Sequence, residues 1–514
     1  MTGRGQAIPL RDRSLTFLGT QVPLDPRVLV VAAVADVRTM PRSLKAWLAF
    51  LLGVIAMGGV AALIALPPGW EVFGTSPTVE WGLLIIGYVG FAITTSGLCL
   101  ASSLGTVFGV DRFRPLEKRH AILAVLCLTS AFGIIALDLH WPVRLVFGAV
   151  LSPSPTSPMW WMGVFYGGYL CLLLVEVWSM FSDHPHIHQW ACTLAAFMAI
   201  VAPATLGAVF GVLVARSYWN GPFTPILMVA SAFLSGVALL GIVFYGVVRL
   251  RRPGFERAGR LAVPGLRGLL GLGLIVVSVL LARHLVAGLD GDGRGLREAT
   301  EAVLAGPLAI PFWAIRVGIG LALPLLLIVV PFTRTPNGLL VASVGALIGV
   351  FADRWLFVAA GQIAPVTASA GVVSNPYAVY GPSPVEVAIV LGAAAFVALG
   401  YTLAERYLDL RESDLHFAWA LMPAIQRVRV TRLALYEAAL ARWSRAGVEP
   451  EPEGDVASVA GDDPRGSPIA AAAVASPDEA APPGAAVDPP STPDEAAPND
   501  DAVASSSVLE EAGE

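Results

Sequence analysis

Ten long apolar segments dominate this 514-residue sequence and restrict what it can fold into. A helix needs about 20 predominantly apolar residues to cross roughly 30 Å of hydrocarbon, whereas a barrel strand needs about half as many. Because backbone amides in lipid must be hydrogen-bonded within the protein, segments of this length predict transmembrane helices. The sequence therefore predicts an all-α integral membrane protein with about ten spanning helices, at 45–66, 81–108, 119–138, 159–181, 189–213, 222–249, 262–285, 309–332, 337–359 and 384–404.

Composition and charge divide the chain into a membrane domain and an acidic tail. Only 14% of the residues are charged, against about a quarter in soluble domains. Residues 449–514 carry 16 Asp and Glu but a single basic residue, Arg465, and are rich in Pro and Ala, so this tail is predicted to be disordered. The expected organisation is an N-terminal cytoplasmic arm (1–40), a transmembrane domain (41–410), an amphipathic cytoplasmic region (411–448) and the disordered tail (449–514).

The distribution of Lys and Arg predicts the orientation of the helices. Basic residues cluster before the first segment and after the second, sixth and tenth, and cytoplasmic loops of membrane proteins are enriched in Lys and Arg. Both termini are therefore expected in the cytoplasm, and the protein in a bacterial inner membrane. Anionic lipid is an expected partner, but nucleic acid is not, because the basic residues are not interleaved with exposed aromatics.

Polar side chains gather at the predicted outer ends of the helices. Ionisable groups inside a membrane are costly, so each one is a candidate functional residue. Taken singly, each could serve helix packing or reach the lipid headgroups. Taken together, they predict a polar pocket that hydrogen-bonds a quinone and exchanges protons with the periplasm, with Asp138 or His140 as proton acceptor. The candidates are Asp138, His140, Arg144, Arg316, Asp353, Arg354, Gln362 and Glu386.

On the cytoplasmic side, one acidic residue, Glu176, lies within a spanning segment. It could relay protons, or its side chain could extend to the membrane surface, and the sequence leaves both interpretations open. Residues 183–188 contain three alternating histidines, which we interpret as a titrating loop, because so short a loop rarely closes a tetrahedral metal site alone. The single cysteines are predicted to be buried apolar residues: Cys99, Cys127, Cys171 and Cys192.

Neither haem nor an iron–sulfur cluster is expected in this chain. The seven histidines lie at or beyond the ends of the predicted helices, whereas an embedded haem would need histidines within facing helices. The cysteines form no CxxC pair that could hold a cluster.

Several motifs resemble those of the NrfD-like membrane subunits of polysulfide reductase and related complexes. The third segment ends in Asp-Leu-His-Trp-Pro (138–142), where that family usually has Asp-Leu-Gly-Arg-Pro, and Ser-Pro-Met-Trp (157–160) opens the fourth. Thr-Leu-Gly (205–207) resembles the fifth helix of the family. Arg354-Trp355, Gln362 and Glu386 resemble the end of its ten-helix branch, which includes membrane subunits of hydrogenases and alternative complex III.

This resemblance implies a fold and a function. The fold would be two four-helix bundles, formed by the second to fifth and sixth to ninth helices and flanked by the first and tenth. The chain would hold no redox cofactor of its own and would exchange electrons between menaquinone or ubiquinone and an iron–sulfur partner, with a molybdopterin, hydrogenase or multihaem cytochrome subunit as further partners. The implied quinone site comprises Asp138, His140, Arg144, Met159, Trp160, Arg354, Gln362 and Glu386.

Two other functions compete with this one. Many relatives place a histidine just before the Thr-Leu-Gly motif, whereas this chain has Val-Ala-Pro-Ala (201–204), which favours a non-catalytic anchor or a proton-conducting paralogue. A secondary transporter would be expected to carry broken helices and polar groups at the membrane midplane, and the polar groups here gather at one face instead.

Overall fold

The computed structural model describes residues 39–66, 72–139, 152–182, 184–249, 255–290, 295–363, 380–408 and 410, together with two short strands at 14–17 and 20–23. His140, Arg144 and Asp183 lie outside these residues, as do the predicted amphipathic region 411–448 and the predicted disordered tail 449–514. The strands β1 (Ser14–Phe17) and β2 (Thr20–Pro23) pair antiparallel. This hairpin within the N-terminal arm was not predicted from the sequence.

Ten helices among the described residues are long and apolar enough to cross a membrane, which confirms the predicted number. The eighth changes from a π-helix, η5, to an α-helix, α11, where the N–H of Leu323 donates to the carbonyl of Gly318, five residues back. The ten are α2 (Arg42–Ile64), α3 (Leu83–Thr106), α4 (Glu117–Asp138), α6 (Pro158–Met180), α7 (Pro185–Gly211), α8 (Phe223–Arg249), α9 (Phe255–Asp290), η5 (Pro311–Ala322) with α11 (Leu323–Val329), α12 (Pro336–Ile363) and α13 (Pro384–Tyr407).

Short helices occupy some of the connections. The 3₁₀-helix η3 (Asp111–Leu116) leads into α4, and η6 (Pro331–Thr333) leads into α12. An amphipathic helix, α10 (Leu296–Leu304), lies between α9 and η5 and packs against α9 and α12. Proline is the first residue of α6, α7, α13 and η5, a position where its missing N–H costs no helical hydrogen bond.

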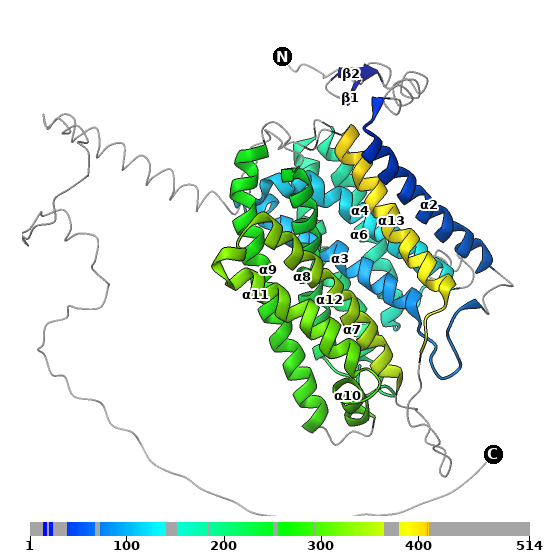
Figure 1. Ribbon diagram of the computed structural model, residues 1–514. Coiled ribbons are helices and arrows are strands. Elements are labelled where there is room, and N and C mark those ends of the chain that lie inside the picture. The colour runs from blue at the N-terminus through cyan, green and yellow to red at the C-terminus, as the bar shows by residue number, and fades with distance from the viewer. Residues whose placement is uncertain are drawn as a thin grey trace, which may run out of the picture. The chain divides into compact units, whose positions relative to one another are not determined.

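The spanning helices form the two expected bundles. The first consists of α3, α4, α6 and α7, and the second of α8, α9, η5 with α11, and α12. The bundles meet chiefly where α3 and α7 pack against α8. The first and last spanning helices, α2 and α13, lie side by side (Figure 1), and α13 packs against α4 of the first bundle.

Small residues allow the helices to approach closely at three crossings. A Cβ atom added to Gly97 of α3 would lie 1.7 Å from the carbonyl oxygen of Ala232 of α8. Similar contacts join Gly58 of α2 to Gly392 of α13, and Gly320 of η5 to Gly349 of α12. Packing of this kind holds helices together where lipid removes the hydrophobic drive for association.

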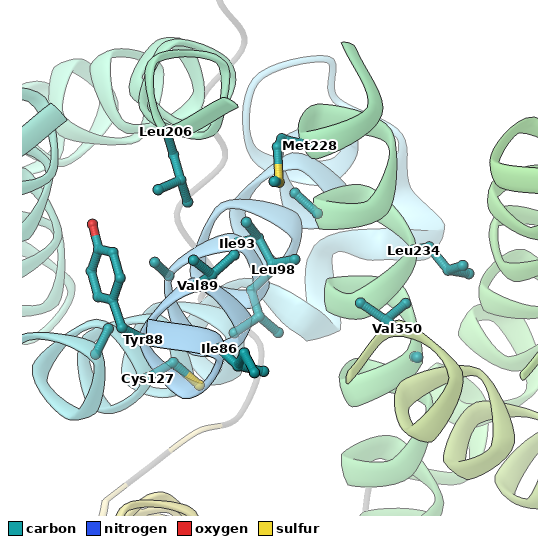
Figure 2. Close-up of a cluster of buried hydrophobic side chains, with 14 of the residues drawn as sticks. Ile86, Tyr88, Val89, Ile93, Leu98, Cys127, Leu206, Met228, Leu234 and Val350 are labelled. Atoms are coloured by element: carbon teal, nitrogen blue, oxygen red, sulfur yellow. The ribbon is translucent and has the colours of Figure 1, made fainter. Parts of the chain in front are cut away.

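The apolar core continues from one bundle into the other through α3. This helix is the most buried of the spanning helices, with 78% of its most apolar window inside the protein. Figure 2 shows its side chains among those of neighbouring helices: Ile86, Val89, Ile93 and Leu98 of α3, with Cys127 of α4, Leu206 of α7 and Met228 of α8.

The orientation of the bundles follows from the positive-inside rule and stays a prediction. Reporter domains fused within 250–254 or after Tyr407 should give cytoplasmic signals, and those fused within 152–157 or 291–294 should give periplasmic signals, in assays of green fluorescence and phosphatase activity. The fusions after Tyr407 and within 291–294 serve as internal controls for each side. A periplasmic signal from a fusion at 250–254 would contradict the assigned orientation.

Candidate functional site

Glu386 binds four donors at the predicted outer face and is almost fully buried. Its carboxylate accepts hydrogen bonds from the backbone N–H groups of Gly74 (3.0 Å), Ser383 (2.8 Å) and Leu83 (3.2 Å) and from the Tyr380 hydroxyl (2.7 Å). Ser383 caps α13 by accepting from the N–H of Glu386, so the two residues form a capping box. Glu386 therefore fastens the segment that precedes α3 to the start of α13.

Gln362, at the end of α12, holds the same segment from the other bundle. Its amide oxygen accepts from the N–H of Trp81 (2.9 Å), and its amide nitrogen donates to the carbonyls of Trp81 (3.0 Å) and Val358 (3.2 Å). The Trp81 ring stacks on Trp219, with centroids 4.9 Å apart. The atoms through which Gln362 and Glu386 would bind a quinone are thus engaged in internal hydrogen bonds.

Arg354 belongs to a different group of residues, inside the second bundle. Asp353 accepts from Nε of Arg316 (2.8 Å) and from a guanidinium nitrogen of Arg354, and Arg354 also contacts the sulfur of Met228. The two arginines and Asp353 are buried. Arg354 precedes Gln362 by eight residues, a rise of about 12 Å along the helix, so the structure divides the predicted pocket into two groups.

The two arginines outnumber their single carboxylate partner. Within the described part of the chain, both terminal nitrogens of Arg316 and Nε of Arg354 have no hydrogen-bond partner. The geometry agrees with the packing interpretation of Asp353 and Arg354, in which charges on different helices pair with one another.

Asp138 is half-buried and is the last residue of α4. Burial raises the pKa of the Tyr380 hydroxyl, and the carboxylates of Glu386 and Asp138 raise it further. In the first turn of α6, which packs against α4, Met159 is exposed, and Trp160 is half-buried and packs edge-on against Trp161. Asp138 and Glu386 thus both interact electrostatically with the Tyr380 hydroxyl. Met159 and Trp160 lie on α6, the helix that packs against α4.

At the opposite end of the first bundle, Glu176 of α6 is fully buried and faces His120 of α4. His120 Nε2 lies 3.1 Å from a carboxylate oxygen of Glu176. The interpretation that Glu176 extends to the membrane surface is therefore wrong. His120 was not singled out from the sequence, although an acidic residue inside a spanning segment requires a partner.

The three alternating histidines diverge, and the cysteines differ in burial. The His184 ring stacks on Trp178, His186 is exposed, and His188 binds Glu117 at 2.7 Å. Among the described residues, no group of three or more His, Cys, Asp or Glu side chains could hold a metal ion. Cys99, Cys127 and Cys192 are buried as predicted, but the prediction is wrong for Cys171, which is exposed because it faces out of α6.

Comparison with known proteins places this architecture in a family. The family described as "Polysulphide reductase, NrfD" matches residues 71–366, which include both bundles. The chain is 25% identical to a selenate reductase subunit of Mesobacillus selenatarsenatis, over 61% of this chain and 82% of that protein. It is 25% identical to the Hdr-like menaquinol oxidoreductase integral membrane subunit of Archaeoglobus fulgidus, over 61% of this chain and 78% of that protein.

A third relative covers more of both chains. The putative dimethyl sulfoxide reductase membrane subunit of Halobacterium salinarum is 27% identical over 73% of this chain and 94% of its own length. Because the family match extends over more than half of the 514 residues and contains the two helical bundles, this chain is a multi-pass membrane protein that belongs to the NrfD polysulphide reductase family.

Proposed function

We propose that this chain is the quinone-reactive membrane subunit of a multi-subunit oxidoreductase, in which it passes electrons between menaquinone or ubiquinone and a partner iron–sulfur subunit. Three relatives support this proposal, two of them named as reductase subunits and one as a menaquinol oxidoreductase membrane subunit. The further partner would be a soluble catalytic subunit that holds molybdopterin, a hydrogenase centre or several haems.

The observation that carries the proposal is the position of Asp138. Oxidation of a quinol releases two protons with its two electrons, so the site needs a proton acceptor that communicates with water. Asp138 is half-buried at a helix end, where it can meet both a head group and solvent. Met159 and Trp160 lie in the first turn of the neighbouring α6 and offer an apolar and aromatic surface to a quinone ring.

The proposal predicts a large loss of activity from Asp138→Asn. The amide keeps the size of the side chain but cannot accept the proton, so quinol-dependent electron transfer should fall at least tenfold, since a general base typically contributes about 10²–10⁴-fold. The rate is measured with the assembled complex and a soluble quinol analogue. Asp290→Asn is the matched control, because Asp290 is the exposed last residue of α9 at the same predicted face, and it should leave the rate unchanged.

The opposite result would support the anchor interpretation. If Asp138→Asn assembles in normal amounts and keeps the full rate, Asp138 is not the proton acceptor, and another subunit would bind the quinol. The Val-Ala-Pro-Ala stretch before Thr205 would agree with an anchor function, because these four residues of α7 have no titratable side chain.

A further inference from the structure

The pair of His120 and Glu176 is buried within the first bundle and is incompletely hydrogen-bonded. Both side chains are about 1% exposed. Within the described residues, the two Glu176 oxygens and His120 Nδ1 have no hydrogen bond of good geometry. Since buried polar atoms normally have partners, these atoms have the capacity to bind water or a mobile proton.

The residue next to His120 shows what a purely structural ion pair looks like on the same helix. Arg119 donates from Nε and NH2 to the two oxygens of Glu405 on α13, at 3.2 and 3.1 Å, and from NH1 to the carbonyl of Leu410 at 2.9 Å. That pair joins two helices and its partners satisfy one another. His120 and Glu176 are equally buried, yet His120 Nδ1 and the two Glu176 oxygens lack the well-aligned hydrogen bonds that Arg119 and Glu405 make, so this pair keeps positions at which a proton or a water can bind.

A second His–Glu pair connects this site with the predicted cytoplasmic surface. His188 Nε2 lies 2.7 Å from Glu117, and both side chains are partly exposed. On its other side, His188 Nδ1 lies 3.0 Å from the hydroxyl of Ser179, which also donates to the carbonyl of Glu176. His188 therefore connects the carboxylate of Glu117 with the hydroxyl of Ser179.

Cys192 lies between the two pairs. Its sulfur is 3.5 Å from Nε2 of His188, and the thiol also interacts with Glu176. Ser179 is on α6 with Glu176, and Cys192 is one helical turn beyond His188 on α7, so the partly exposed and buried pairs are neighbours in the structure.

Polar groups continue from His120 toward the middle of the bundle. Cys99 of α3 interacts with both His120 and Tyr169. The Tyr169 hydroxyl donates to the carbonyl of Thr95 at 3.5 Å. One turn farther along α6, the hydroxyl of Tyr166 is buried and has no hydrogen-bond partner in the described part of the chain. All four helices of the first bundle thus contribute to one series of polar groups.

We propose that this series is a proton-uptake path from the predicted cytoplasmic face into the first bundle, a function beyond the quinone reaction proposed above. A proton from water binds to the pair of His188 and Glu117. It passes by way of Cys192 or an intervening water to the pair of Glu176 and His120. Each group releases a proton as it takes one up, so only O–H, N–H and S–H bonds form and break and nothing is oxidised.

The path predicts how fast the buried imidazole exchanges its hydrogen with water. Full-length protein in lipid vesicles, with isotope-labelled histidine, is transferred to deuterated water, and the N–H of His120 is followed by infrared spectroscopy. His120→Asn identifies the band. In the wild type we expect exchange to be complete within minutes, and in the double variant Glu117→Gln with His188→Gln we expect it to be at least tenfold slower.

Two further variants control for general effects. His186→Gln removes an exposed histidine two residues before His188 on α7. In this variant the N–H of His120 should exchange as fast as in the wild type. Glu117→Asp keeps the carboxylate and should also exchange rapidly. Unchanged exchange in the double variant, or no exchange of His120 in the wild type over hours, would overturn the proposal. The measurement needs no quinone, so its failure is distinct from failure of the proposed quinone reaction.

Discussion

Gly97→Val should reduce the yield of folded protein at least tenfold. A Cβ at this position would lie 1.7 Å from the backbone oxygen of Ala232, well inside contact distance, and valine adds two methyl groups beyond it. The neighbour is backbone of α8, which cannot turn aside as a flexible side chain does. Since α3 and α8 join the two bundles, the expected cost exceeds the roughly 1–3 kcal/mol of ordinary overpacking.

The measurement is the amount of monodisperse protein recovered in mild detergent from equal amounts of membrane. Gly168→Val is the matched control, because Gly168 also lies within a spanning helix, α6, and a Cβ added there would have no atom within 4 Å. Both variants place a β-branched residue in a helix, so the difference between their yields reports the effect of the close approach of α3 to α8. A normal yield of Gly97→Val would contradict the close approach of α3 to α8.

Asp353→Asn should destabilise the second bundle by about 3–5 kcal/mol, as removal of one member of a buried ion pair does. The variant keeps the volume of the side chain but leaves the buried guanidinium groups of Arg316 and Arg354 without their shared carboxylate. Stability is measured by denaturant-induced unfolding in detergent micelles or bicelles. The wild type and the variant are compared by their unfolding midpoints.

An exposed ion pair of the same chain provides the control for Asp353. Arg297 and Glu301 pair on α10 at 3.0 Å with side chains 64% and 51% exposed, so Glu301→Gln should change stability by at most about 1 kcal/mol. If Asp353→Asn were as stable as the wild type, the two arginines would have to reach other acceptors, and the packing role of Asp353 would be wrong.

The spanning helices were predictable because a segment in lipid must be apolar and must satisfy its own backbone hydrogen bonds. The predicted segment 384–404 corresponds to Pro384–Tyr407, and 159–181 to Pro158–Met180, since hydropathy and N-terminal prolines both mark these ends. The predicted segment 262–285 was too short, because α9 extends to Phe255–Asp290 with charged residues at both ends. The side-by-side arrangement of α2 and α13 could not be read from hydropathy, which contains no information on which apolar helices meet.

The candidate site was predictable in its residues but not in their partners. Gln362 and Glu386 bind main-chain groups of Trp81, Leu83 and Gly74, and every residue except proline offers the same main-chain groups, so the sequence does not mark these contacts. His120 was missed for a different reason. It lies near a helix end, as a loop-facing residue would, and only the packing of α4 against α6 turns it toward Glu176.

The pairing of α2 with α13 has a consequence for synthesis of the protein. Helix α2 packs mainly against α13, and only 17% of its most apolar window is buried. About 320 residues separate Ile64 from Pro384, and a ribosome adding about 5–20 residues per second needs on the order of half a minute to make them. During that interval the surface of α2 around Gly58 has no Gly392 to pack against, so any chain that ends before Pro384 contains an α2 helix without its main packing partner.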